Sequence, residues 1–132
     1  MRHEPQEIAV AAVAAAVLSG APSTVWTLAT RGDLLASTRA AGMIVHRPGV
    51  IAGAAVHAGM SVGWTIALAA VLPCRGRALG AVLGAAAGAG IAALDLGLVA
   101  PRRFPAVAAL PLGPQLADHL AFGAIVGWCL GR

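Results

Sequence analysis

The chain has 132 residues, of which 59% are hydrophobic and 11% charged, and its formal net charge is +4. Soluble domains carry about 25% charged residues, and a chain this short cannot bury such an apolar excess in its own core. The composition excludes an ordinary soluble domain and predicts an integral membrane protein whose main partner is the lipid bilayer. The nine arginines are scattered between apolar segments rather than gathered in a stripe, which argues against nucleic acid as a partner.

The first predicted helix covers about residues 8–30 and is interrupted near its middle. It is long enough to cross a bilayer, which takes about 20 apolar residues. Gly20 and Pro22 break it, since proline removes a backbone hydrogen bond and bends a helix. Two forms of the break stay open: a kink at Pro22, or a second short helix capped by Ser19 or Ser23. Because lipid cannot satisfy the freed backbone groups, we expect the break to face protein.

Residues 31–49 form the predicted connection at the membrane interface. Within it, residues 33–41 are expected to form a short amphipathic helix that lies along the bilayer surface. The apolar positions of this segment are Leu34, Leu35, Ala41 and Ile44.

Two further helices are predicted at about 50–72 and 78–100, the second closed by Pro101. The turn between them is so short that they must form an antiparallel hairpin. A last helix covers about 112–130, and the proline-rich stretch before it is expected to be irregular or interfacial. The predicted fold class is therefore all-α, an integral membrane bundle of about four transmembrane helices in a single domain over residues 1–132.

The arginines flank both ends of the predicted bundle and leave its orientation open. With four spans, four arginines lie at the end that holds both termini and five at the opposite end. Such an even distribution gives the positive-inside rule no side to choose. We expect a multi-pass protein of the cell membrane.

Four ionisable residues and one serine at membrane depth form the candidate polar cluster: His57, Ser61, Asp95, Asp118 and His119. Ionisable groups are costly inside a bilayer, so each of them needs a partner or a function. Because successive helices run in opposite directions, the four ionisable residues fall in the same half of the bilayer, near the 31–49 connection.

Small residues share helix faces with these polar side chains. Glycines recur at four-residue intervals on the third and last predicted helices, and Gly53 precedes His57 by one turn. Such ridges let helix backbones approach closely in lipid. The glycines concerned are Gly80, Gly84, Gly88, Gly123 and Gly127.

Three roles stay open for the polar cluster. The first is helix packing, in which interhelical hydrogen bonds stabilise the bundle by about 0.6–2 kcal/mol each. The second is a proton or small-solute path through His57, Asp95 and His119, which in a chain this small would need a homo-oligomer to enclose it. The third is a haem bound by the two histidines, or a metal bound by histidine and aspartate.

No catalytic residue, resident cofactor or metal site is predicted, and we expect a protein that is not an enzyme. Ser61 follows His57 by one helical turn, but no third group completes a triad. Cys74 and Cys129 form no metal or disulfide pattern and are predicted to be free thiols. The three tryptophans, which we expect to be interface anchors or packing groups, are Trp26, Trp64 and Trp128.

Several segments together resemble a group of small uncharacterised actinobacterial membrane proteins. The element His119-Leu-Ala-Phe-Gly-Ala is also similar to inner-membrane proteins of the YagU type. The segments that carry the first resemblance are Ser19-Gly-Ala-Pro-Ser-Thr24, Ser37-Thr-Arg-Ala-Ala-Gly42, the helix around His57, Ala93-Leu-Asp-Leu-Gly97 and Asp118-His-Leu-Ala-Phe-Gly-Ala124. Both resemblances imply a polytopic membrane protein, and neither implies an activity.

Overall fold

The computed structural model describes residues 3–73 and 75–132, and this part of the chain contains helices and loops but no strand. The predicted break in the first segment is confirmed. Helix α1 (Pro5–Leu18) ends before the break and α2 (Ala21–Ala29) begins after it. The prediction of a serine cap is wrong, because the residue before α2 is Gly20, and no side chain at that position caps the helix.

The interfacial connection holds α3 (Ala36–Gly42) and the 3-10 turn η1 (Met43–Val45). The helix begins three residues later than predicted, because the Asp33 carboxylate accepts a hydrogen bond from the Leu35 N–H at 2.9 Å. Such a bond forms an Asx turn, which competes with the helical backbone. Leu35 is also exposed rather than packed against the bundle.

Helix α4 (Val50–Val71) has nearly the predicted limits, and α5 (Arg77–Leu94) follows it in the opposite direction. The two helices do not form a packed hairpin, because α5 packs along α8 rather than along α4. The prediction that Pro101 closes the second helix is wrong. The chain continues through a π-helical turn, η2 (Asp95–Val99), into the short helix α6 (Ala100–Arg103). Because the Ala100 N–H bonds to the carbonyl of Asp95, five residues back, the backbone stays helical up to a proline that has no N–H to donate.

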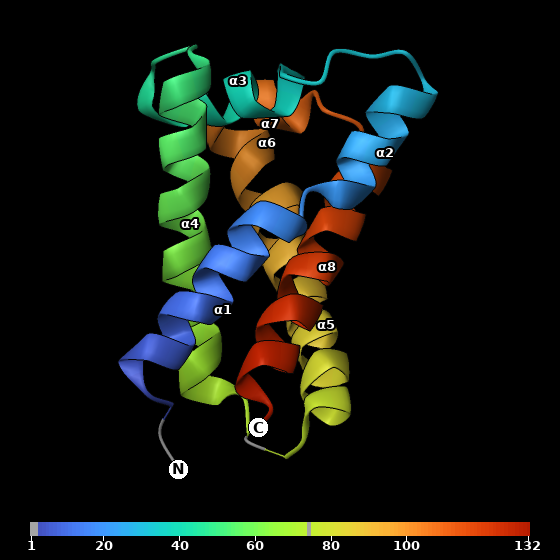
Figure 1. Cartoon of the computed structure of the whole chain (residues 1–132). Helices are drawn as coiled ribbons and strands as arrows, with labels where there is room; N and C mark the ends of the chain where they lie inside the picture. The colour runs from blue at the N-terminus through green and yellow to red at the C-terminus, as the bar shows by residue number, and fades with distance from the viewer. Residues whose placement is uncertain (1–2, 74) are drawn as a thin grey trace.

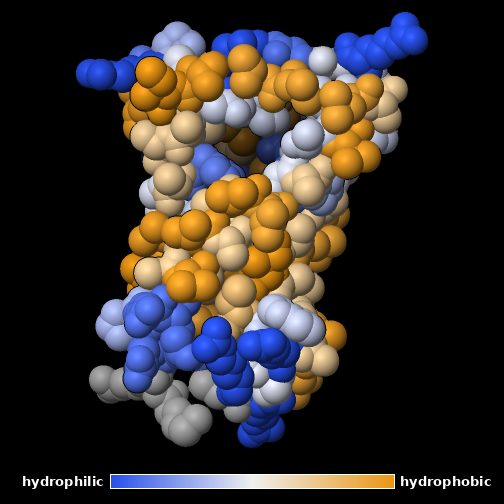
Figure 2. Space-filling model, viewed as in Figure 1, coloured by the Kyte–Doolittle hydropathy of each residue, from blue (hydrophilic) through white to orange (hydrophobic). Residues whose placement is uncertain are grey.

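The proline-rich stretch contains the short helix α7 (Pro105–Ala108), and α8 (Leu112–Leu130) follows with the predicted limits. Within the described part of the chain, three helical segments are long and apolar enough to cross a membrane: Pro5–Ala29, Val50–Val71 and Arg77–Arg103. The protein is therefore compatible with a multi-pass membrane protein. Figure 2 shows the matching surface, with apolar residues over much of the middle and hydrophilic residues gathered at both ends.

The helices form an elongated bundle with two different ends (Figure 1). The start of α1, the end of α4, the start of α5 and the end of α8 lie at one end. The end of α2 lies at the opposite end, together with α3, α6 and α7. Cys74 lies outside the described residues, so its predicted free thiol is not tested, whereas Cys129 is a free, half-buried thiol.

Helices α5 and α8 pack with their backbones in contact through facing glycines. A Cβ added to Gly84 would lie 2.0 Å from the carbonyl oxygen of Gly123, and the reverse contact is equally short. Gly80 and Gly127 form a second such pair one turn away. The prediction of a close-packed glycine face is confirmed, and these positions leave no room for any side chain.

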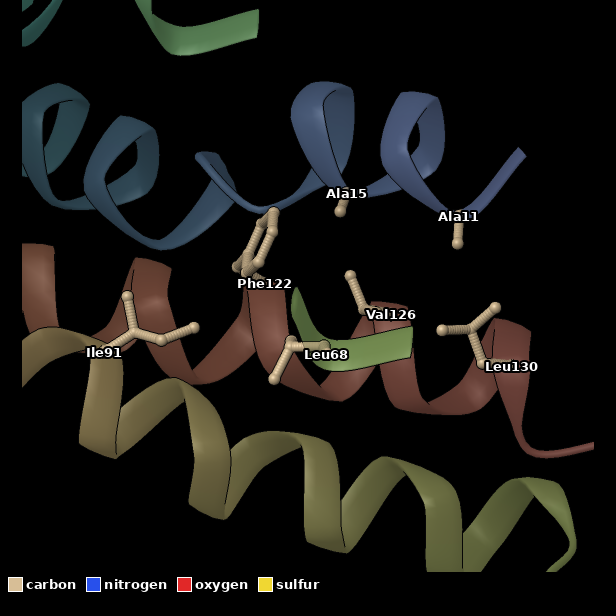
Figure 3. Close-up of a cluster of buried hydrophobic side chains, with 7 residues drawn as sticks. All are labelled: Ala11, Ala15, Leu68, Ile91, Phe122, Val126 and Leu130. Carbon is tan, nitrogen blue, oxygen red and sulfur yellow. The ribbon is translucent and has the colours of Figure 1, made fainter. Parts of the chain in front are cut away.

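An apolar core fills the half of the bundle nearest the termini. Figure 3 shows side chains of α8 pointing toward two alanines of α1, with Leu68 of α4 beside them. The buried residues of this core are Ala11, Ala15, Leu68, Ile91, Phe122, Val126 and Leu130. Val126 is fully buried, so this half of the molecule is closed.

Candidate functional site

A cavity of about 300 Å³ lies in the other half of the bundle, beneath α3. Figure 2 shows it as a hollow on one flank, with hydrophilic side chains inside. The cavity is lined by residues of α3, α4, α7 and α8 and by the continuous segment from α5 to α6. The structure brings all five members of the predicted polar cluster to its wall: His57, Ser61, Asp95, Asp118 and His119.

Asp95 and His119 face each other across the cavity wall. Asp95 Oδ2 and His119 Nε2 are 3.8 Å apart, and both side chains are mostly buried. His119 Nδ1 lies 2.8 Å from the backbone carbonyl oxygen of Gln115. A carbonyl oxygen can only accept, so Nδ1 must carry a hydrogen. In neutral His119, the lone pair of Nε2 therefore faces the Asp95 carboxylate, which is unfavourable. The two side chains attract each other only when one further proton is bound to Nε2 or to the carboxylate.

The π-helical turn η2 sets the position of Asp95. Asp95 is the first residue of this turn, and its own carbonyl accepts the Ala100 N–H. Single π turns are rare and often occur at functional sites, because the extra residue changes the direction of the side chains around it. Leu96 and Val99 of the same turn also line the cavity.

His57 is engaged in a contact between helices. Its Nε2 lies 2.9 Å from the carbonyl oxygen of Ala16 in the last turn of α1. The last four carbonyls of a helix lack intrahelical partners, and the break after Leu18 creates such an end inside the bundle. His57 thus donates to a backbone group that lipid would leave unsatisfied, which makes this bond part of the packing between α1 and α4.

Asp118 performs the corresponding role at the start of α2. Its Oδ1 accepts a hydrogen bond from the Ser23 N–H at 2.9 Å. Ser23 is the third residue of α2, the position whose N–H an N-cap side chain usually satisfies. The residue before the helix is Gly20, which has no side chain, so a carboxylate from α8 supplies the cap. As predicted, the break faces protein.

Two hydroxyl groups follow His57 on the same face of α4. Ser61 is 4% exposed, lines the cavity, and forms no hydrogen bond with the described residues. Thr65, one turn further, is fully buried, and its Oγ1 has no partner among the described residues. The fold thus uses His57 and Asp118, whereas Ser61, Asp95 and the Nε2 atom of His119 remain available at the cavity.

The structure adds cavity residues that sequence reasoning missed. Gln115 donates weakly to the carbonyls of Val107 and Leu110, at 3.4 and 3.3 Å, and so joins α8 to the segment before it. Its spacing of four residues from His119 was the available signal. Trp64 packs against the apolar core, in line with the expectation of an anchor or packing group, and it also lines the cavity, as does Phe104.

The geometry gives no support to the haem and metal alternative. Among residues 3–73 and 75–132, no three histidine, cysteine or acidic side chains lie close enough together to hold a metal ion. The His57 Nε2 atom is occupied by a backbone carbonyl, and Nδ1 of His119 is occupied in the same way. An axial haem ligand would have to come from the remaining nitrogen of each ring.

The described residues form a helical bundle with an apolar core in one half and a polar cavity in the other, and its three long apolar segments are compatible with a multi-pass membrane protein. No family model matches the chain, and no curated protein or solved structure matches it either.

Proposed function

We propose that this membrane protein binds a small amphipathic solute in the cavity, as a carrier does in one of its states. One observation carries the proposal: three polar groups that form no hydrogen bond with another described residue lie on a largely apolar wall. They are the hydroxyl of Ser61, the carboxylate of Asp95 and Nε2 of His119. Ligand sites typically combine an apolar lining with a few convergent polar groups, and volumes start at about 300 Å³.

The remaining polar residues of the cluster are proposed to stabilise helix packing. His57 bonds to the end of α1 and Asp118 to the start of α2, so both hold the broken first segment against the bundle. Packing and binding therefore divide the cluster between them. This division explains why His57 and Asp118 form hydrogen bonds, whereas Ser61 and Asp95 at a similar depth do not.

Binding is favoured over conduction by the closed half of the bundle. Leu68, Val126 and Leu130 are each at most 4% exposed and lie between the cavity and the far end (Figure 3). A channel needs a continuous polar path, and this core offers none within one chain. A carrier needs only one open side at a time.

We further propose α8 as a fourth span, in the cell membrane. Its 19 residues give a length of about 28 Å at about 1.5 Å per residue, close to the hydrocarbon thickness of about 30 Å. It packs against α5 through the facing glycines along most of this length.

The test uses benzyl alcohol, a small amphipathic neutral solute, with the protein in lipid nanodiscs. Trp64 lines the cavity, Trp26 borders a separate hollow beside Pro22 and Pro111, and Trp128 belongs to neither. The indole N–H signal of Trp128 in a ¹⁵N-labelled sample is therefore the internal control. We expect benzyl alcohol to shift the Trp64 signal saturably, whereas the Trp128 signal should change without saturating.

A cavity-filling variant sharpens the test. Ala41→Phe places a ring in the cavity wall and should abolish the saturable shift. Ala67→Phe places the same ring on an exposed face of α4 and should preserve it. Equal, non-saturating shifts of the Trp64 and Trp128 indoles in the wild-type protein would refute the proposal.

A further inference from the structure

We propose that the cavity is selective for small organic cations, that Asp95 is the counter-ion, and that binding releases the Nε2 proton of His119, the ionic neighbour of Asp95. The inference rests on the proposed solute-binding function and names its substrate class. The class is a quaternary or protonated amine attached to an apolar body.

The charges around the cavity favour a cation. The titratable groups that line it are His57 on α4, Asp95 on η2, and Asp118 and His119 on α8. Two are carboxylates, and within the described part of the chain no arginine lines the cavity. With His57 neutral and His119 protonated, these four groups sum to one negative charge, two carboxylates against one charged ring, and an anion would find no permanently charged partner.

Two of the arginines at this end have partners outside the cavity. Arg39 pairs with the Asp33 carboxylate at the surface. The Arg102 guanidinium donates to the carbonyl oxygen of Leu98 at 2.9 Å. Neither residue belongs to the cavity wall, so neither neutralises Asp95.

Aromatic side chains supply a second element of cation recognition. Trp64, Phe104 and Phe122 all line the cavity. The negative faces of aromatic rings attract quaternary ammonium groups, and the attraction strengthens when the site is desolvated. A carboxylate together with several rings distinguishes a cation from a neutral molecule of the same shape.

The position of Asp95 supports its role as the counter-ion. Its carboxylate has no hydrogen bond to another described residue, and its one ionic neighbour, His119 Nε2, is 3.8 Å away. A purely structural carboxylate such as Asp118 has a backbone N–H at 2.9 Å. The π turn that holds Asp95 at the wall is a second, independent feature typical of functional sites.

Proton release follows from the tautomer of His119. Before binding, His119 carries a proton on Nε2 as well as the Nδ1 hydrogen that Gln115 accepts, and this charged ring is the ionic neighbour of Asp95. When the cation arrives, Asp95 stays a carboxylate and pairs with it. The Nε2 proton leaves to water and His119 becomes neutral. One positive charge enters and one proton departs, so the net charge of the site is unchanged.

The experiment compares two ligands of the same shape by calorimetry, with the whole chain in nanodiscs. Benzyltrimethylammonium carries the charge, and neopentylbenzene replaces its nitrogen with carbon. Titrations in two buffers of different ionisation enthalpy give the number of protons released. We expect saturable binding of the cation alone, with up to one proton released per cation and a smaller release at high pH.

Two variants locate the effect. Asp95→Asn should weaken binding of the cation on the order of 100-fold, as expected when one partner of a buried charge pair is removed, and should abolish proton release. Asp33→Asn removes a surface carboxylate outside the cavity and should change neither quantity.

The wild-type protein alone can overturn the inference, whatever the folding of the variants. Equal affinity for neopentylbenzene, or cation binding without proton release, would refute it. Failure of the cation to bind would also refute it, while the benzyl alcohol result decides separately whether the cavity binds solutes at all.

Discussion

The Asp118 carboxylate of α8 caps α2 through the Ser23 N–H, at 2.9 Å and across 95 positions of the sequence. Loss of an N-cap side chain typically costs about 0.5–2 kcal/mol. We therefore expect Asp118→Ala to loosen α2, with faster hydrogen exchange at Ser23 and its neighbours. Asp118→Asn keeps an acceptor oxygen and should exchange nearly as slowly as the wild type. Equal exchange in all three proteins would show that the cap does not hold α2.

Gly84 is expected to tolerate no side chain. Because an added Cβ would meet the carbonyl of Gly123 at 2.0 Å, Gly84→Ala must push α5 and α8 apart. Overpacking of this kind costs about 1–3 kcal/mol, so the midpoint of thermal unfolding in detergent should fall. Gly90 has open space around it, and Gly90→Ala should leave the midpoint unchanged or raise it, since alanine favours a helix by about 1 kcal/mol. Similar effects of the two substitutions would contradict the backbone contact.

Replacement of Thr65 by valine is expected to stabilise the protein. The Thr65 hydroxyl is fully buried and unpaired among the described residues, and burial of such a group costs about 1–3 kcal/mol by mutational measures. Thr65→Val removes the polar atom at nearly constant shape, so the unfolding midpoint should rise. Thr30→Val, at an exposed threonine bonded to the Trp26 carbonyl, serves as the control and should have little effect. A loss of stability in Thr65→Val would mean that the hydroxyl has a partner.

The ring of His119 is expected to keep a hydrogen on Nδ1 whatever its charge. The Gln115 carbonyl is an acceptor only, so the neutral form must be the Nδ1–H tautomer. Nitrogen chemical shifts of labelled histidine distinguish the two tautomers directly. His46, which lies outside the cavity wall, provides a reference ring in the same sample. Detection of the neutral Nε2–H form at His119 would contradict the hydrogen bond from Nδ1 to the Gln115 carbonyl.

The wild-type protein is expected not to conduct protons. Among the described residues, the apolar core of Leu68, Val126 and Leu130 separates the cavity from the far end and offers no polar path. Proteoliposomes loaded with a pH-sensitive dye should therefore lose a proton gradient no faster than empty liposomes. A faster loss that Asp95→Asn abolishes would establish the proton path and set aside the preference for binding.

Much of the architecture was predictable because lipid imposes simple rules. Apolar stretches of spanning length gave the helices, and the limits 112–130 agree with α8. The glycine intervals predicted the close face of α5, since no other residue permits such contact. Alternating helix direction placed the ionisable residues in one half of the bundle.

What escaped prediction depends on local backbone geometry. Pro101 suggested a helix end, but a π turn accommodates the proline. No sequence pattern marks where the backbone bonding changes to the five-residue spacing of a π turn. Ser19 and Ser23 suggested caps, whereas the acceptor comes from Asp118, far away in the sequence. The division of the polar cluster into paired and available groups depends on which side chains meet. Depth and helical face alone could not supply it.

The glycine contact between α5 and α8 has a mechanical consequence. Because sliding or separation of these two helices would break that backbone contact, we expect α5 and α8 to move as one unit. We therefore expect any movement that widens or closes the cavity mouth to come from the other side of the bundle. The discontinuity between α1 and α2 already provides an articulated joint there. Helix α2 would then move relative to α5 and α8, and the hydrogen bond from the Ser23 N–H to Asp118 would restrain that movement.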